Sequence, residues 1–225
     1  MSNERYQDGS VVRSSTLGGI NTVLKNTYML LAMTLVWSAL MAFVAYSMNF
    51  GMINPWVFIG GAIGLQLLIH FTADSSLGIL ATFLFTGFLG FTVGPFLNLI
   101  INTLSNGSEL VMIAAGGTGL VFFGLSGYIL TTKKDMTWLS GALVAGGMVA
   151  LVAMIVSVFL DIPAIQLTLC VFFIILSSAM ILYQTSSIVQ GGETNYVLAT
   201  VSLYLSIYNL FMTMLQLLVA FYGDR

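Results

Sequence analysis

Long apolar segments alternate with short polar ones along this chain of 225 residues. A helix rises about 1.5 Å per residue, so about 20 apolar residues cross the hydrocarbon layer of a bilayer. The sequence offers such segments seven times, at residues 26–48, 55–71, 77–101, 110–130, 137–160, 163–184 and 196–222. The connections between them are too short to hold a soluble domain. We therefore predict an all-α integral membrane protein with seven transmembrane helices in one domain, residues 26–222.

Residues 1–25 differ from the rest, because they are polar and contain no apolar run. Such a segment cannot bury enough surface to fold alone, which predicts a flexible tail. Positive residues indicate the orientation of the bundle, since Lys and Arg favour cytoplasmic loops. Five of them precede the first span or follow the fourth, and one lies on the opposite side: Arg5, Arg13, Lys25, Lys133 and Lys134 against Arg225. The N-terminus is predicted to be cytoplasmic and the C-terminus periplasmic.

The last span carries a polar stripe without a charge. Its members recur at intervals of four, three, four and three residues, and so share one helical face: Ser202, Ser206, Asn209, Thr213 and Gln216. Polar side chains in a membrane interior are costly unless they find internal partners, so this face predicts a helix near the centre of the bundle. The stripe is either a hydrogen-bonding seam that faces the sixth helix, or the lining of a wet path or gate.

Composition narrows the function classes. Only 6% of the residues are charged, against 58% hydrophobic, and the mean hydropathy is +1.01. The net charge of -2 and the absence of a basic run exclude nucleic acid as a partner. A single cysteine, Cys170, and a single histidine, His70, leave no material for a disulfide or a multi-histidine metal site. We expect no cofactor, no metal and no enzymatic activity.

Three short polar segments lie between the spans. His70 is either a polar residue at the membrane edge or a gate element, since histidine changes its charge between pH 5 and 8. The segment Lys133 to Asp135 is most simply a topology anchor. The segment GGETNY, residues 191–196, predicts a glycine hinge followed by a helix that Thr194 or Asn195 caps.

Four stretches together resemble the Bax inhibitor-one family of seven-span membrane proteins. They are FTGFLGFTVGPFLN (85–98), GGTGLVFFGLSGYILTTKKDM (116–136), SSAMILYQTSSIVQGGETNYV (177–197) and TVSLYLSIYNLF (200–211). The resemblance implies six helices around a central seventh and, for the bacterial branch of the family, the inner membrane. It also implies a partner, the membrane-anchored, ATP-driven zinc protease FtsH. A tightly packed substrate with a tail that the protease can grip would occupy FtsH and slow its work on other substrates.

The resemblance also raises an alternative, a pH-sensitive calcium or cation leak. Leak-forming members of the family carry one aspartate in the sixth helix and one in the seventh. Gln184 and Ser206 stand at the matching positions here, and neither side chain can ionise. A basic residue that latches such a pair corresponds to His70 by approximate position only. We therefore expect modulation of FtsH and disfavour the leak.

Overall fold

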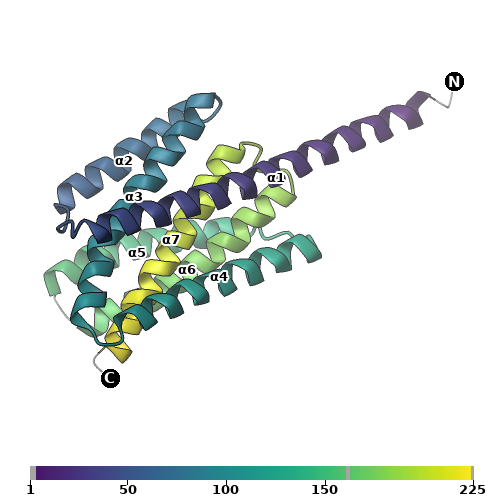
Figure 1. Ribbon diagram of the computed structural model, residues 1–225. Coiled ribbons are helices and arrows are strands. Elements are labelled where there is room, and N and C mark those ends of the chain that lie inside the picture. The colour runs from purple at the N-terminus through teal and green to yellow at the C-terminus, as the bar shows by residue number, and fades with distance from the viewer. Residues whose placement is uncertain (1–3, 161–162, 224–225) are drawn as a thin grey trace.

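The computed structural model describes residues 4–160 and 163–223, and the side chains of residues 19–157 and 164–223. All regular structure in these ranges is helical (Figure 1). The helices are α1 (Glu4–Ser47), α2 (Pro55–Thr72), α3 (Ser76–Thr103), α4 (Gly107–Thr132), α5 (Leu139–Leu160), α6 (Pro163–Val189) and α7 (Tyr196–Tyr222). Each is long and apolar enough to cross a membrane, which confirms the prediction of seven spans.

The start of α1 differs from the prediction. The helix begins at Glu4, whereas the predicted span begins at Asn26 after a flexible tail. A helix adds residues readily once a nucleus exists, and the anchored part of α1 supplies that nucleus. Val23 and Leu24 also pack against the main apolar core. The predicted tail is therefore wrong for residues 19–25, which belong to the bundle, and residues 1–3 lie outside the described residues.

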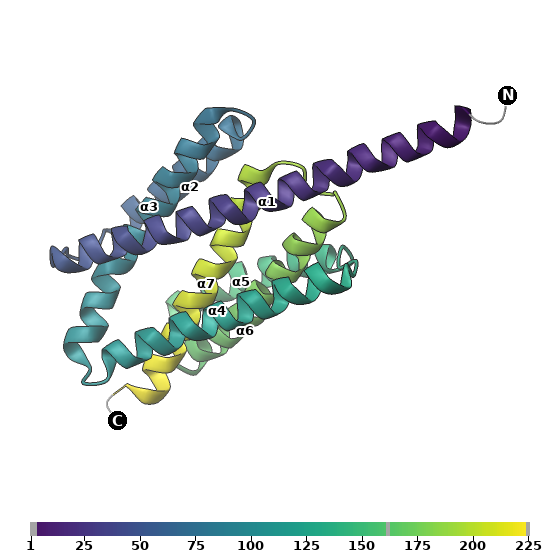
Figure 2. The same ribbon diagram turned by 45° about the vertical axis from the view of Figure 1, so that its right-hand side comes forward.

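α7 lies inside the bundle and packs against α1, α2, α3, α4 and α6 (Figures 1 and 2). Its buried side chains include Leu203, Tyr204 and Leu210, each at most 1% exposed. α5 packs only against α6 within the described part of the chain. The resemblance implied that six helices surround the seventh, but the contacts place five of them against it. Gly146 of α5 meets side chains of α6 instead, whereas a Cβ atom added at Gly141 or Gly147 would meet nothing within 4 Å.

Close packing through small residues is concentrated between α1 and α3. A Cβ atom added at Gly90 would overlap the backbone carbonyl of Ser38, and one added at Gly94 would lie 2.7 Å from the carbonyl oxygen of Ala42. Gly90 and Gly94 thus allow the backbones of α1 and α3 to approach closely. By contrast, a Cβ atom at Gly60 would meet nothing within 4 Å, so that glycine faces outward.

The connections that follow α2, α4 and α6 gather at one end of the bundle, which we call the lysine end because it carries Lys133 and Lys134. α6 continues to Val189, past the predicted end at Gln184, and stops where Gly191 adopts a φ of +77°. Asn195 caps α7, because its Oδ1 accepts the N–H groups of Val197 and Leu198, the second and third residues of the helix. Of the two residues predicted as the cap, Thr194 and Asn195, the structure therefore shows Asn195 in that role.

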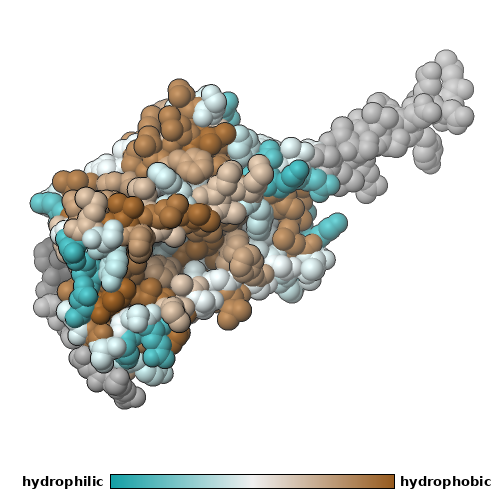
Figure 3. All heavy atoms as spheres, viewed as in Figure 1, coloured by the Kyte–Doolittle hydropathy of each residue, from teal (hydrophilic) through white to brown (hydrophobic). Residues whose placement is uncertain are grey.

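The outer surface suits a bilayer. In Figure 3, hydrophobic residues cover the middle of the visible face, and hydrophilic ones lie mainly toward its ends. Large exposed apolar side chains occur on α2 and α5, for example Trp56 at 81% and Met148 at 66% exposed. In water such a surface would be an aggregation liability, whereas in lipid it is the expected one.

Candidate functional site

The polar stripe of α7 does not face a single environment. Ser206 is buried, Ser202 and Thr213 are half-buried, and Asn209 and Gln216 are exposed. A face that turned evenly toward other helices would bury all five. The stripe is therefore divided between the interior of the bundle and its outer surface.

The hydrogen bonds of the stripe also differ from the predicted seam. Ser206 Oγ donates to the carbonyl of Ser202 at 2.9 Å, and Thr213 Oγ1 donates to the carbonyl of Asn209 at 2.7 Å. Both bonds lie within α7, because a serine or threonine hydroxyl reaches the carbonyl one turn earlier. In the described residues, the stripe bonds to α6 through Gln216, whose Oε1 accepts from Cys170 Sγ at 3.5 Å. The hydroxyl groups of Ser206 and Thr213 bond within α7 instead, so the interhelical seam stays a prediction for the rest of the stripe.

The polar contacts that tie α7 to its neighbours come from a different face. Tyr204 OH accepts from Ser38 Oγ of α1 at 2.6 Å and donates to the carbonyl of Thr86 of α3 at 3.2 Å. One turn earlier, the hydroxyl group of Thr200 shares its proton between the carbonyl of Tyr196 in its own helix at 2.7 Å and that of Thr27 in α1 at 3.2 Å. Thr200 and Tyr204 are four residues apart in the sequence, so they lie on one face of α7. The sequence prediction rested on the longer polar stripe beside them and did not single out this face.

The two positions that match the family aspartates do not form a pair. Gln184 Nε2 lies 4.0 Å from Met180 Sδ of its own helix, and no hydrogen bond joins Gln184 to Ser206 in the described residues. His70 is exposed at the end of α2, where its ring meets that of Phe71 at 6.1 Å. Gln184, Ser206 and His70, the three positions that could form such a latch, are thus not joined to one another by a hydrogen bond in the described residues.

Beside Gln184, Thr185 forms a polar junction of three helices that the sequence did not predict. Thr185 is fully buried, and its hydroxyl lies 3.3 Å from Ser126 Oγ of α4 and 3.4 Å from Tyr28 OH of α1. The next residue, Ser186, accepts the N–H of Met136 at 2.9 Å. The sixth helix therefore holds both α1 and the loop that follows α4 through neutral hydroxyl groups.

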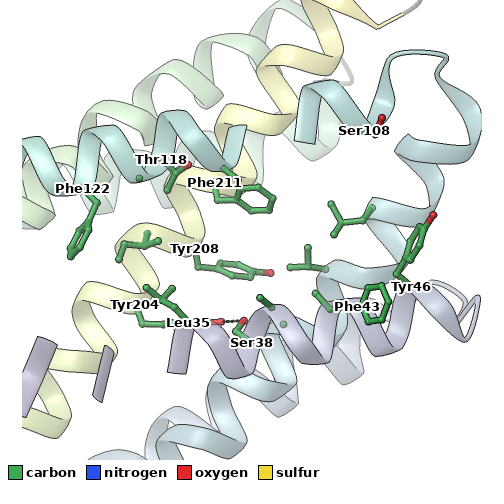
Figure 4. A pocket seen from close by; sticks show the side chains of 18 of the residues that line it. Leu35, Ser38, Phe43, Tyr46, Ser108, Thr118, Phe122, Tyr204, Tyr208 and Phe211 are labelled. Carbon is green, nitrogen blue, oxygen red and sulfur yellow. Dashed lines mark hydrogen bonds between the residues drawn. The ribbon is translucent and has the colours of Figure 1, made fainter. Parts of the chain in front are cut away.

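A cavity of about 660 Å³ lies between α1, α3, α4 and α7 (Figure 4). Aliphatic and aromatic side chains line most of it, with hydroxyl groups from serine, threonine and tyrosine. No Asp, Glu, His, Lys or Arg is among the lining residues. A second cavity of about 330 Å³ lies between α2, α3 and α7, and there Asn209 and Gln66 bring amide groups. Neither cavity offers the acid and base groups that catalysis needs.

Metal binding is not supported either. Among the described residues, no group of three or more His, Cys, Asp or Glu side chains is placed to hold an ion. Asn195 Nδ2 donates to Asp74 Oδ1 at 2.8 Å, which uses one of the few carboxylates to join two loops at the lysine end. The arrangement defines a neutral, helical membrane bundle with an apolar internal cavity.

Comparison with known proteins identifies the class. The family described as "Inhibitor of apoptosis-promoting Bax1" matches residues 20–223, and the chain belongs to that family. It is 46% identical over 224 residues to an uncharacterized protein of Pseudomonas aeruginosa, covering 100% of both chains. It is 43% identical over 215 residues to the modulator of FtsH protease YccA of Escherichia coli K12, covering 96% of this chain and 97% of that one. The same protein in E. coli O6:H1 is named an inner membrane protein.

Proposed function

We propose that this chain is a multi-pass protein of the bacterial inner membrane that binds FtsH and slows it, as a substrate that is poorly extracted. The observation that carries the proposal is the 43% identity to a protein named as a modulator of FtsH, over nearly the full length of both chains. The family description names an inhibitor and the relative's name a modulator, and both support a regulatory role.

The packing of the bundle supports slow extraction. A protease that pulls on one end must separate helices before it can cleave them, and the work depends on how closely they pack. α1 meets α3 at Gly90 and Gly94 without room for a methyl group, and meets α7 through the bonds of Thr27 and Ser38. A force applied at the N-terminus therefore acts first on the closely packed contact between α1 and α3.

The segment before Gly19 is the part that the protease would grip. Positive residues favour the cytoplasmic side for this end, which is where an ATP-driven protease acts on a membrane protein. Residues 1–18 are mostly polar and carry Arg5 and Arg13. A chain end that carries few apolar residues can be seized without unfolding the membrane domain.

Pull-down and turnover tests examine this proposal together. FtsH should co-purify with the full chain, and its degradation of a second membrane substrate should slow when the chain is added. Deleting residues 1–18 should abolish the slowing, and a glycine- and serine-rich segment of equal length should restore it. No association, together with unchanged turnover, would overturn the proposal.

The ion leak remains the second candidate function, and two observations weigh against it. Gln184 and Ser206 cannot share a proton as a carboxylate pair does. The large cavity is lined mainly by apolar side chains, which do not replace the hydration shell of an ion. Calcium flux into vesicles at pH 6 and pH 8 tests this directly, with Gln184→Asp plus Ser206→Asp as a gain-of-function control. If the wild type conducts calcium and the conduction depends on pH, the leak becomes the leading candidate function.

A further inference from the structure

The large cavity opens sideways, toward the bilayer. No Cα atom of α1 lies within 8 Å of a Cα atom of α4, so the backbones of these two walls stay apart along their described lengths. The gap is bridged toward the lysine end, where the rings of Tyr28 and Phe122 lie 6.1 Å apart. Of the other described helices, α2 and α5 pack against neither α1 nor α4. An occupant can therefore enter the cavity from the side of the bundle, between α1 and α4.

Hydroxyl groups lie at both ends of the cavity and, in smaller number, between them. In Figure 4, the bonded pair of Ser38 and Tyr204 closes one end, while Tyr46 and Ser108 lie at the other. Tyr46 is next to the last residue of α1, and Ser108 is the second residue of α4, so this end lies at a membrane boundary. Between these ends Tyr208 points its hydroxyl group into the cavity, and Thr118 also lines it. Most of the remaining lining is apolar, and it includes Val93, Leu97, Ile207 and Phe211. The site is thus mainly apolar, with a small number of hydroxyl groups.

The volume of the cavity selects among possible occupants. A helix is about 10 Å across and rises about 5.4 Å per turn, so about 660 Å³ holds only about one and a half turns of a transmembrane helix. At about 30 Å³ per heavy atom, as in liquid water, the same space holds about 20 heavy atoms. That is the size of one fatty acyl chain with its ester group. Water is a poor occupant, because it needs two to four polar partners.

We propose that this cavity binds one acyl chain of a bilayer phospholipid, which enters between α1 and α4 with its ester end near Ser108. The chain completes the packing of the apolar walls, and α1 and α4 are held apart by it rather than by each other. Lipid is then part of the folded structure at a place where the bundle does not close upon itself.

Two glycines of α4 offer a matched pair of variants. Gly119 lines the cavity and Gly116, one turn away, does not, and a Cβ atom added at either would meet nothing within 4 Å. Gly119→Leu therefore fills the cavity, whereas Gly116→Leu places the same side chain outside it. Ala115→Leu, also in the lining, is a second filling variant in case Gly119→Leu does not fold.

The assay is photo-crosslinking in vesicles of phosphatidylethanolamine and phosphatidylglycerol, with a small share of phosphatidylcholine that carries a diazirine on one acyl chain. Adducts are mapped by mass spectrometry at Phe122 and Tyr208 inside the cavity, and at Leu120, which is 78% exposed, as the reference for bulk lipid. We expect cavity adducts in the wild type and in Gly116→Leu, and their loss in the filling variants, with Leu120 labelled throughout.

Two results would overturn the proposal. The first is a labelling pattern without preference for the cavity, in which Leu120 is labelled but the cavity residues are not, or Gly116→Leu and Gly119→Leu show equal cavity labelling. The second is a cavity filled with water. In that case Thr118→Cys, in a Cys170→Ala background, would react with a membrane-impermeant thiol reagent as fast as a cysteine in a loop.

Discussion

The hydroxyl of Tyr204 links three helices, and its removal gives a sharp test of the packing described above. Tyr204 is 1% exposed, and its oxygen bonds to Ser38 of α1 and to the carbonyl of Thr86 of α3. Tyr204→Phe keeps the ring and removes both bonds without leaving a large void. Interhelical hydrogen bonds in membranes contribute on average about 0.6 kcal/mol each and at most about 1.7 kcal/mol. Two bonds together predict a loss of about 1 to 3 kcal/mol in the free energy of unfolding.

The measurement is reversible unfolding in mixed micelles, extended to a double-mutant cycle with Ser38→Ala. The two substitutions share one bond, so their effects should fall short of additivity by about 0.5 to 1.5 kcal/mol. Tyr183→Phe is the matched control, since Tyr183 is half-buried and makes no hydrogen bond in the described part of the chain; its effect should stay within about 0.5 kcal/mol. If Tyr204→Phe matches this control, or the cycle is additive, the junction does not stabilise the fold.

Three further predictions concern packing, a helix cap and pH. Gly94→Leu should destabilise the bundle by about 3 kcal/mol or more, because the new side chain meets backbone atoms of α1, whereas Gly60→Leu should be nearly neutral; unfolding of the two variants side by side checks this. Asn195→Ala should cost about 1 kcal/mol through loss of the α7 cap, measured in the same way. The backbone N–H of Thr137 holds the pKa of Asp135 below its usual value. Its stabilisation is therefore present at neutral pH and lost as the pH falls through the lowered pKa, so unfolding curves of wild type and Asp135→Asn should converge in acid.

The number and extent of the spans could be predicted from sequence, because apolar length is set by the thickness of the bilayer. α2 begins at Pro55, where the predicted span begins, and α7 begins directly after the predicted cap residue Asn195. The start of α1 could not be placed so well, since polar residues can continue a helix that is already anchored. Burial of Val23 and Leu24 depends on contacts with helices that are distant in sequence.

The candidate site was less predictable, for a physical reason. Helical spacing shows which side chains share a face, but not whether that face meets a helix or lipid. Ser206 and Asn209 lie on one stripe, yet the first is buried and the second exposed. A hydroxyl can also satisfy itself within its own helix, so a polar residue in a span does not imply a partner on another helix. The cavity depends on which helices fail to meet, and no local pattern encodes that.

The central claim is that a tightly packed membrane bundle slows FtsH because it resists extraction. The most direct measurement is FtsH turnover of a second membrane substrate in the same vesicles, with wild type, Gly94→Leu or Gly60→Leu added in equal amounts. We predict that wild type and Gly60→Leu are degraded slowly and slow the turnover of the second substrate for a long time. Gly94→Leu should be degraded fast, so the turnover of the second substrate should soon recover. Turnover that is unchanged by the wild type, or slowed for equally long by Gly94→Leu, would contradict the account.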